Sequence, residues 1–239
     1  MSQLKNVIRF HQCHGQNIDL FEDRTVALRS RGFADALVFS ERPLRPGEIF
    51  AVDIESKERG WNGHLRLGLT TFIPSQEAVL PKYSLPDLTN SHPSWIFAVS
   101  KRFMFEPLLN DCPEDTPTIP ETVLKPKTFV RHVTDNGSRL AIMYLNAGKF
   151  AQMYFISNGD EVKICAERIP SHDPLYAVVD VYGKTRQVRL VQISSVRTLL
   201  EASRDAIISS LNQTKNGVKQ LVDDVCLPVH LKQYLLSHS

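Results

Sequence analysis

The sequence predicts an all-β sandwich followed by a small three-helix C-terminal module. The first observation is that residues 8–193 hold many short apolar or alternating segments separated by turn residues, with no helical interlude. The second is that the apolar residues of 194–239 recur at helical spacing instead. A hydrophobic content of 42% is enough for a proper core. We therefore assign the sandwich to residues 8–193 and the helical module to residues 194–239.

The sandwich strands are predicted in order along the chain. Residues 65–70 alternate strictly, so Leu65, Leu67 and Leu69 should share one buried face. The other strands are predicted at residues 7–10, 18–20, 25–29, 36–39, 49–54, 95–99, 140–144, 152–156, 176–181 and 188–193.

Four residues around the strand at 65–70 carry further expectations. Gly63 and Gly68 predict a close backbone approach or a bulge. Arg66 lies on the face opposite the leucines, where it is either exposed or paired across the sheet. Trp61 is expected to pack over the core, with a ligand-facing role as the alternative.

A Pro-rich insertion loop is predicted at residues 105–127. Five of the chain's 14 prolines occur there together with several acidic residues. This composition favours an exposed loop with little fixed structure, and a binding or modification segment is the alternative. It is not a domain boundary, because the strand pattern resumes after it.

Composition excludes several classes of partner. The net charge is +2 and no dense stripe of Lys and Arg occurs, which argues against nucleic acid and against a membrane surface. No window reaches the roughly 18 consecutive apolar residues of a membrane span, and the first ten residues do not form a signal peptide. The four cysteines have no paired spacing, as expected for thiols in a reducing compartment. We expect a cytoplasmic protein.

No catalytic or metal-binding motif is present. On a strand, His11 and Cys13 would share one face while His14 points to the other, so the three side chains would not converge on a metal. Asp53 and Glu55 are expected to be surface charges and not an acid–base pair. The sequence contains no nucleophile elbow, dinucleotide-binding glycine motif or P-loop, so no catalytic residue and no cofactor is predicted.

The helix predicted at residues 198–211 has a wide apolar arc. The arc covers about half of the circumference, whereas packing on a single core needs a stripe of only about 100°. The helix is therefore expected to bury two surfaces, one of which can belong to another protein. Thr198, Leu199, Ser203 and Ile207 resemble the elongin-binding pattern of the SOCS box. The resemblance implies binding to elongin C and elongin B, with Leu199 as the anchor.

A second pattern follows near the end of the chain. Pro228 suits the first position of a further helix, and Leu227, Pro228, Leu231 and Tyr234 resemble a cullin box. His230 stands where the cullin-5 type usually has proline, so the resemblance implies cullin-5 or cullin-2, together with a RING-box protein. The alternative for both patterns is a plain helical hairpin that closes the sandwich.

The sandwich carries a family resemblance of its own. Residue clusters occur in order at Phe10-His11 with Gly15, and at 39–44, 60–70, 85–88 and 174–183. Together they resemble a neuralized homology repeat, a β-sandwich relative of the SPRY domain. The family pattern is lost in the insertion at 105–127.

These resemblances imply a substrate-recognition adaptor of an elongin B–elongin C–cullin–RING E3 ubiquitin ligase. Such a subunit is not itself an enzyme, and a RING finger would need eight Cys or His ligands that four scattered cysteines cannot provide. The sandwich would bind an unidentified substrate protein through loops at one end. The runner-up is a stand-alone sandwich that binds a peptide or glycan and has a structural helical tail. The candidate substrate-binding residues are Ser40, Glu41, Arg42, Pro43, Gly60, Trp61 and Asn62.

Overall fold

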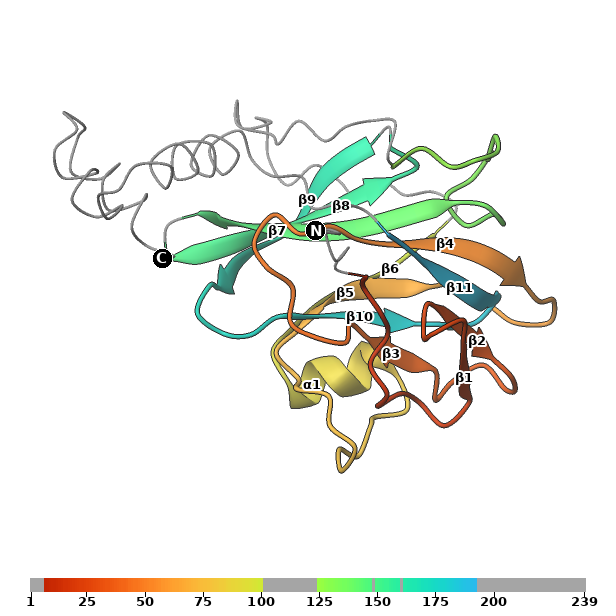
Figure 1. The fold of residues 1–239 in the computed structure, drawn as a ribbon, viewed down its shortest axis with the longest axis horizontal. Coiled ribbons are helices and arrows are strands. Elements are labelled where there is room, and N and C mark those ends of the chain that lie inside the picture. Colours follow the sequence, from red (N-terminus) through yellow and green to blue (C-terminus); the bar gives the residue numbers. More distant parts are fainter. Residues whose placement is uncertain (1–6, 101–123, 148, 160, 193–239) are drawn as a thin grey trace, which may run out of the picture. The chain divides into compact units, whose positions relative to one another are not determined.

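The computed structural model describes residues 7–100, 124–147, 149–159 and 161–192, which form two antiparallel sheets (Figure 1). The larger sheet contains, in spatial order, β1 (Ile18–Phe21), β2 (Val26–Arg29), β11 (Thr185–Val191), β4 (Phe50–Lys57), β7 (Arg139–Ala147), β8 (Phe150–Ser157) and β9 (Glu161–Pro170). The smaller sheet contains β3 (Leu37–Phe39), β10 (Tyr176–Asp180), β5 (Arg66–Thr70) and β6 (Ser94–Ala98). The predicted sandwich is confirmed.

The core lies between the sheets, because alternate residues of each strand point inward. Leu65, Leu67 and Leu69 are fully buried, as are Phe50 and Val52 of β4, and all five belong to one apolar cluster. Burial of each such side chain contributes roughly 1.5–3 kcal/mol. The predicted common face of the three leucines is therefore confirmed.

The backbone of β5 approaches its neighbour β6 closely at Gly68. A Cβ atom at this position would lie 2.0 Å from the carbonyl oxygen of Trp95, so only glycine fits. On the opposite face, Arg66 is the register partner of Asp180 in β10, and its Nη1 lies 3.3 Å from Asp180 Oδ2. The close backbone approach is confirmed, and Arg66 is paired across the sheet.

A short helical stretch covers the outer face of the small sheet (Figure 1). It consists of the segment Ser84–Leu88 and α1 (Thr89–Ser91), and Leu88 packs with Phe39 and Val178 of the sheet. The expectation of no helical interlude is therefore wrong. Eight residues are too few to show a helical period in the sequence.

Two strand predictions need correction. Residues 7–10 form no strand within the described chain; Phe10 makes only an isolated bridge to Ser40. Conversely, β9 is a ten-residue strand that the sequence did not predict. Its pairing with β8 is irregular, with register shifts on both sides of Met153, and such shifts break the alternation by which a strand is recognised.

Some predicted segments lie outside the described residues. They are residues 105–123 of the insertion, together with 193–239, which include the predicted helical module. Leu124, near the end of the insertion, is buried and clusters with Ile49 and Met143 on the outer face of the large sheet. The expected exposure of the whole insertion is therefore wrong at this residue.

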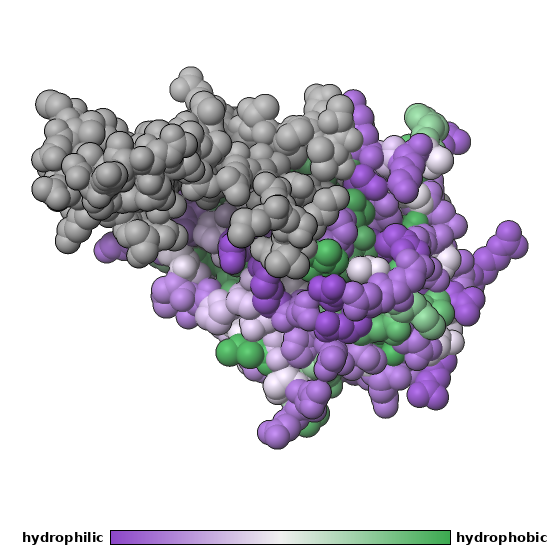
Figure 2. Space-filling view, viewed as in Figure 1, coloured by the Kyte–Doolittle hydropathy of each residue, from purple (hydrophilic) through white to green (hydrophobic). Residues whose placement is uncertain are grey.

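The visible surface of the described residues is mostly hydrophilic, with apolar residues in small groups (Figure 2). Among the described residues, no helix is long and apolar enough to cross a membrane.

Candidate binding site

Residues 11–17 lie along the outer edge of β3 and cover it. The backbone N–H of Gly15 donates to Leu37 O at 2.8 Å, and that of Asn17 donates to Asp35 O at 3.0 Å. Gly15 is required for this approach, because a Cβ atom there would lie 2.2 Å from Asp35 O. The segment thus satisfies a strand edge that would otherwise be free to pair with another chain.

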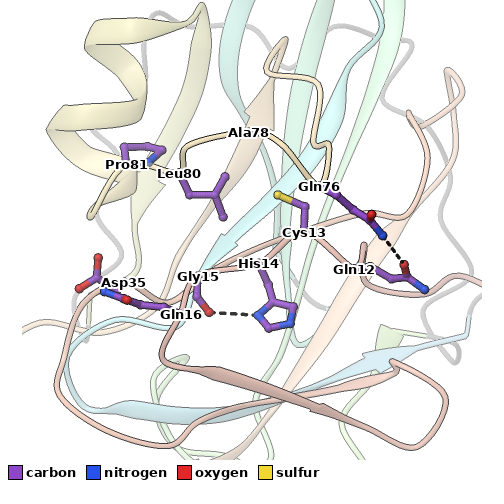
Figure 3. A pocket seen from close by; sticks show the side chains of 10 residues that line it. All are labelled: Gln12, Cys13, His14, Gly15, Gln16, Asp35, Gln76, Ala78, Leu80 and Pro81. Atoms are coloured by element: carbon purple, nitrogen blue, oxygen red, sulfur yellow. Dashed lines mark hydrogen bonds between the residues drawn. The ribbon is translucent and has the colours of Figure 1, made fainter.

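A pocket of about 460 Å³ opens between this segment and the loop before the short helix (Figure 3). Its lining residues are Gln12, Cys13, His14, Gly15, Gln16, Asp35, Gln76, Ala78, Leu80 and Pro81. A second pocket of about 380 Å³ adjoins it and is lined by His11, Gln12, Arg24, Glu41, Ser75 and Gln76. Gln12 and Gln76 line both, and Gln76 Nε2 donates to Gln12 Oε1 across 3.4 Å. We call the two pockets together the trough.

The pKa shifts of two trough residues, His11 and Cys13, favour their neutral forms. Burial lowers the pKa of His11, and the nearby charge of Arg24 lowers it further. Burial raises the pKa of the Cys13 thiol, although a hydrogen bond to the Ser75 backbone opposes the shift. At neutral pH the trough therefore offers neither a thiolate nor an imidazolium at these positions. The groups that the trough offers for hydrogen bonding include the amides of its glutamines and the carboxylates of Asp35 and Glu41.

The predicted candidates Ser40, Glu41, Arg42 and Pro43 lie at one end of the trough, but only Glu41 lines it. Glu41 accepts a hydrogen bond from Arg24 Nη2 at 2.6 Å. Ser40 is buried and donates to Arg42 O at 2.8 Å. Arg42 is engaged with Glu48 by two hydrogen bonds of 2.5 and 2.8 Å. Ser40 and Arg42 therefore hold the local backbone.

The other candidates, Gly60, Trp61 and Asn62, belong to a different surface. Trp61 is half-buried and packs on Phe33, with ring centroids 4.8 Å apart. Tyr83 and Tyr182 also surround Phe33, at 6.3 and 6.1 Å. All four rings are partly exposed. We call Phe33, Trp61, Tyr83 and Tyr182 the aromatic platform.

A buried arginine, Arg29, holds the backbone and side chains that carry the platform. The Arg29 side chain is fully buried, and its guanidinium donates to the carbonyl oxygens of Val181, Gly183 and Thr185 at 2.6–3.0 Å. Arg29 Nη1 also lies 2.7 Å from Glu58 Oε1, the oxygen that accepts a hydrogen bond from Trp61 Nε1 at 2.6 Å. One side chain thus fixes the backbone beside Tyr182 and, through a carboxylate, the indole of Trp61.

The Tyr182 ring is held from two sides. A Cβ atom on Gly63, whose φ of +78° is in the left-handed region, would lie 2.7 Å from this ring. The Arg66 guanidinium stacks on the ring at 3.8 Å from its centroid. Arg66 also donates to Leu85 O at 3.0 Å, which ties down the loop that carries Tyr83.

A buried carboxyl group lies behind this loop. Asp180 Oδ2 accepts hydrogen bonds from the Ser84 backbone N–H at 3.1 Å and from Ser84 Oγ at 2.8 Å. Burial raises the pKa of Asp180, although Ser84 and the Arg66 charge act in the opposite direction. The Asp180 carboxyl group therefore holds the loop that carries Tyr83 in place and does not line the trough.

The two predicted loops lie at opposite ends of β10. Residue Ser40 follows β3 and pairs with Ala177 near the start of β10, whereas Asn62 and Gly63 contact Gly183, beyond its end. They therefore do not form a common loop end. The sequence did not single out Phe33, Tyr83 or Arg29; the one available signal was Tyr182-Gly183, the last residues of the family-like clusters.

The remaining predictions concern metals and partner proteins. In the residues that the structure describes, no group of three or more His, Cys, Asp or Glu side chains could hold a metal ion. His11 Nδ1 accepts from the Cys13 N–H, and His14 Nδ1 bonds to Gly15 O. The elongin and cullin candidates, Thr198, Leu199, Ser203, Ile207, Leu227, Pro228, Leu231 and Tyr234, lie outside the described residues.

Comparisons with known proteins agree with the fold. The family model described as Neuralized matches residues 10–192. Neuralized-like protein 2 of Mus musculus is 35% identical to this chain, covering 95% of it and 90% of the relative. E3 ubiquitin-protein ligase NEURL3 of Mus musculus is 29% identical, covering 78% of this chain and 62% of the relative. The crystal structure of the Drosophila melanogaster neuralized-nhr1 domain superposes with a TM-score of 0.58 at 27% identity, covering 78% of this chain and 98% of that domain. The resemblance to a neuralized homology repeat is therefore confirmed, and the chain belongs to the Neuralized family.

Proposed function

We propose that the protein is the substrate-recognition subunit of an elongin B–elongin C–cullin–RING ubiquitin ligase. The observation that carries the proposal is the order of two patterns along the chain. A Neuralized match over residues 10–192 is followed, at 198–207 and 227–234, by sequences that resemble the elongin and cullin boxes of a SOCS box. The relative NEURL3 is named an E3 ubiquitin-protein ligase, which supports a place in ubiquitin transfer.

In this proposal the sandwich binds the target protein and catalyses nothing itself. The trough supports a binding role, because glutamine side chains line it and can form hydrogen bonds to a target, while burial raises the pKa of the Cys13 thiol and lowers the pKa of His11. Rate enhancement would come from position: the subunit holds a target lysine near a ubiquitin-conjugating enzyme and so raises its effective concentration. We place this activity in the cytoplasm.

The C-terminal residues divide between two partners. Leu199 is the proposed anchor in an apolar pocket of elongin C, with Ser203 and Ile207 on the same side of the helix. Thr198 stands near the helix start, where it can serve as a cap. The cullin contact is assigned to the later pattern at 227–234, and the cullin is cullin-5 or cullin-2, joined to a RING-box protein.

The second candidate function is a stand-alone sandwich that binds a peptide or a glycan. The amide-lined trough favours it, because Gln12, Gln16 and Gln76 can bond to a peptide backbone or to hydroxyl groups. In that case the apolar arc of the C-terminal helix would serve only to close the fold.

Co-expression with elongin B and elongin C, followed by size-exclusion chromatography, separates the two functions. The adaptor proposal expects a stable ternary peak that a Leu199→Asp/Ser203→Arg variant abolishes, while the variant's sandwich stays folded. The matched control is Glu201→Arg/Arg204→Glu, which changes two charges on the opposite side of the same helix and should retain the peak.

Two results would contradict the adaptor assignment. If the wild-type chain elutes alone, or if Leu199→Asp lowers the melting temperature of the sandwich instead of elongin binding, the adaptor assignment fails. The stand-alone binding module is then the better description.

A further inference from the structure

The aromatic platform differs from ordinary core packing in its exposure. Phe33, Trp61, Tyr83 and Tyr182 come from four separate loops, and each ring remains partly open to solvent. Tyr and Trp are the side chains most enriched at binding hot spots, because they offer a large contact area with few rotatable bonds.

The platform is also pre-organised. Arg29 fixes the backbone on both sides of Tyr182, and Glu58 fixes the Trp61 indole. On the Phe33 loop, the Asp35 N–H donates to Lys82 O at 3.0 Å, which joins it to the loop that carries Tyr83. A surface that is already ordered loses little entropy when it binds a partner.

Every ring of the platform has a cationic residue within two positions in the sequence. Arg31 lies two residues before Phe33, Arg59 two before Trp61, Lys82 directly before Tyr83, and Lys184 two after Tyr182. Within the part of the chain that the structure describes, none of these four cations has a carboxylate within ion-pair distance.

Few carboxylates offset this charge. Glu58 is paired with Arg29, and Asp180 is buried beside Arg66. The other nearby acids are Asp35, on the Phe33 loop, and Asp87, in the helical segment after Tyr83; both are half-buried, so the four cations without a carboxylate partner outnumber them two to one. The rim of the platform therefore has a positive potential around an apolar centre.

We propose that the aromatic platform is a docking surface for an acidic protein segment that carries an apolar anchor residue. The anchor packs on the Phe33 and Trp61 rings, and the flanking Asp or Glu residues pair with Arg31, Arg59, Lys82 and Lys184. Charge complementarity selects this occupant over a basic one and makes binding sensitive to salt. The assignment deepens the proposed function, on which it rests for calling the segment part of a substrate.

The test is selection of a random nonapeptide library, displayed on phage, against the full-length protein. The expected result is enrichment of sequences that combine Asp or Glu with one or two large apolar residues. An Arg59→Glu/Lys82→Glu variant should bind the selected peptides roughly tenfold more weakly at low salt, because rim charges set the encounter and its salt dependence. Both positions are exposed, so the variant should keep the wild-type melting temperature.

Lys127→Glu/Lys149→Glu is the matched control. It makes the same change in net charge at exposed positions on loops that adjoin the large sheet, and it should leave peptide affinity unchanged. The inference is overturned if no peptide is enriched, if the enriched peptides lack acidic residues, or if both double variants behave alike. Elongin co-purification of the same proteins is measured separately. Absence of the ternary peak contradicts the ligase proposal, whereas the docking-surface proposal is tested by the peptide selection alone.

Discussion

The trough and the aromatic platform both border the small sheet, yet they are built differently. In the trough, polar side chains largely satisfy one another: Arg24 pairs with Glu41, and Gln76 bonds to Gln12. In the platform, apolar rings are exposed and the neighbouring cations lack carboxylate partners among the described residues.

The difference lies in what supports each surface. The platform rests on a buried charge, Arg29, whose hydrogen bonds all go to the protein itself. The trough rests on backbone pairing along β3, which requires Gly15 but no buried charge. The cations near the platform therefore have no carboxylate partner among the described residues, whereas the trough is lined by neutral amides beside one ion pair.

Replacement of Arg29 by leucine should have the largest effect on stability. It would leave three carbonyl oxygens without their donor and Glu58 without its cation; an unsatisfied buried acceptor costs about 1–3 kcal/mol, so the free energy of unfolding should fall by about 3 kcal/mol or more. Urea unfolding measures the change. Arg31→Leu, two residues away and exposed, is the control and should shift the free energy of unfolding by less than about 0.5 kcal/mol. A loss below about 1 kcal/mol for Arg29→Leu would show that the platform does not depend on this support.

The ion pair at the opposite end of β10 should contribute less. The Glu48 side chain is 9% exposed, but its partner Arg42 is 40% exposed, so solvent screens the pair. Replacement of Glu48 by glutamine should therefore cost about 1–2 kcal/mol at neutral pH.

The same pair gives a pH dependence of defined sign. Burial is the largest influence on Glu48 and raises its pKa, but the Arg42 hydrogen bonds, the Arg45 N–H and both arginine charges together hold that pKa below the ordinary value of 4.5. A carboxyl with a lowered folded-state pKa stabilises the fold above its unfolded pKa, and this contribution disappears as the pH falls through the folded value. Urea unfolding at several pH values should show the difference between wild type and Glu48→Gln shrinking only below pH 4.5. A constant difference down to that limit and beyond would contradict the ionised pair.

Sequence reasoning found the sandwich because strand alternation is a local property. The strict alternation that ends at Thr70 placed Leu65, Leu67 and Leu69 on one face without any knowledge of their partners. The β9 strand escaped because its pairing with β8 shifts register, which the sequence alone cannot reveal.

The candidate sites depend on contacts between distant segments. Phe33, Trp61 and Tyr182 are separated by up to 149 residues in the chain and meet only because β3, β5 and β10 are neighbours. Similarly, Arg29 reads as an ordinary charged residue on a strand, and only the position of the backbone at 181–185 makes it buried. A single sequence without pairing information therefore identified the Trp61 loop but not the residues around it.

The amide pair between Gln12 and Gln76 should have the smallest effect on stability. Its donor–acceptor distance of 3.4 Å is long and the pair is exposed, so a double-mutant cycle with alanine should give a coupling below about 0.5 kcal/mol. A weak bond here means that both amides can exchange partners and donate to a bound peptide, so that the two pockets act as one trough. A coupling above about 1 kcal/mol would instead make the pair a structural partition. In that case the trough would consist of two separate pockets. Each pocket would then hold a smaller ligand than the platform, so the two surfaces would differ in the size of their ligands as well as in charge.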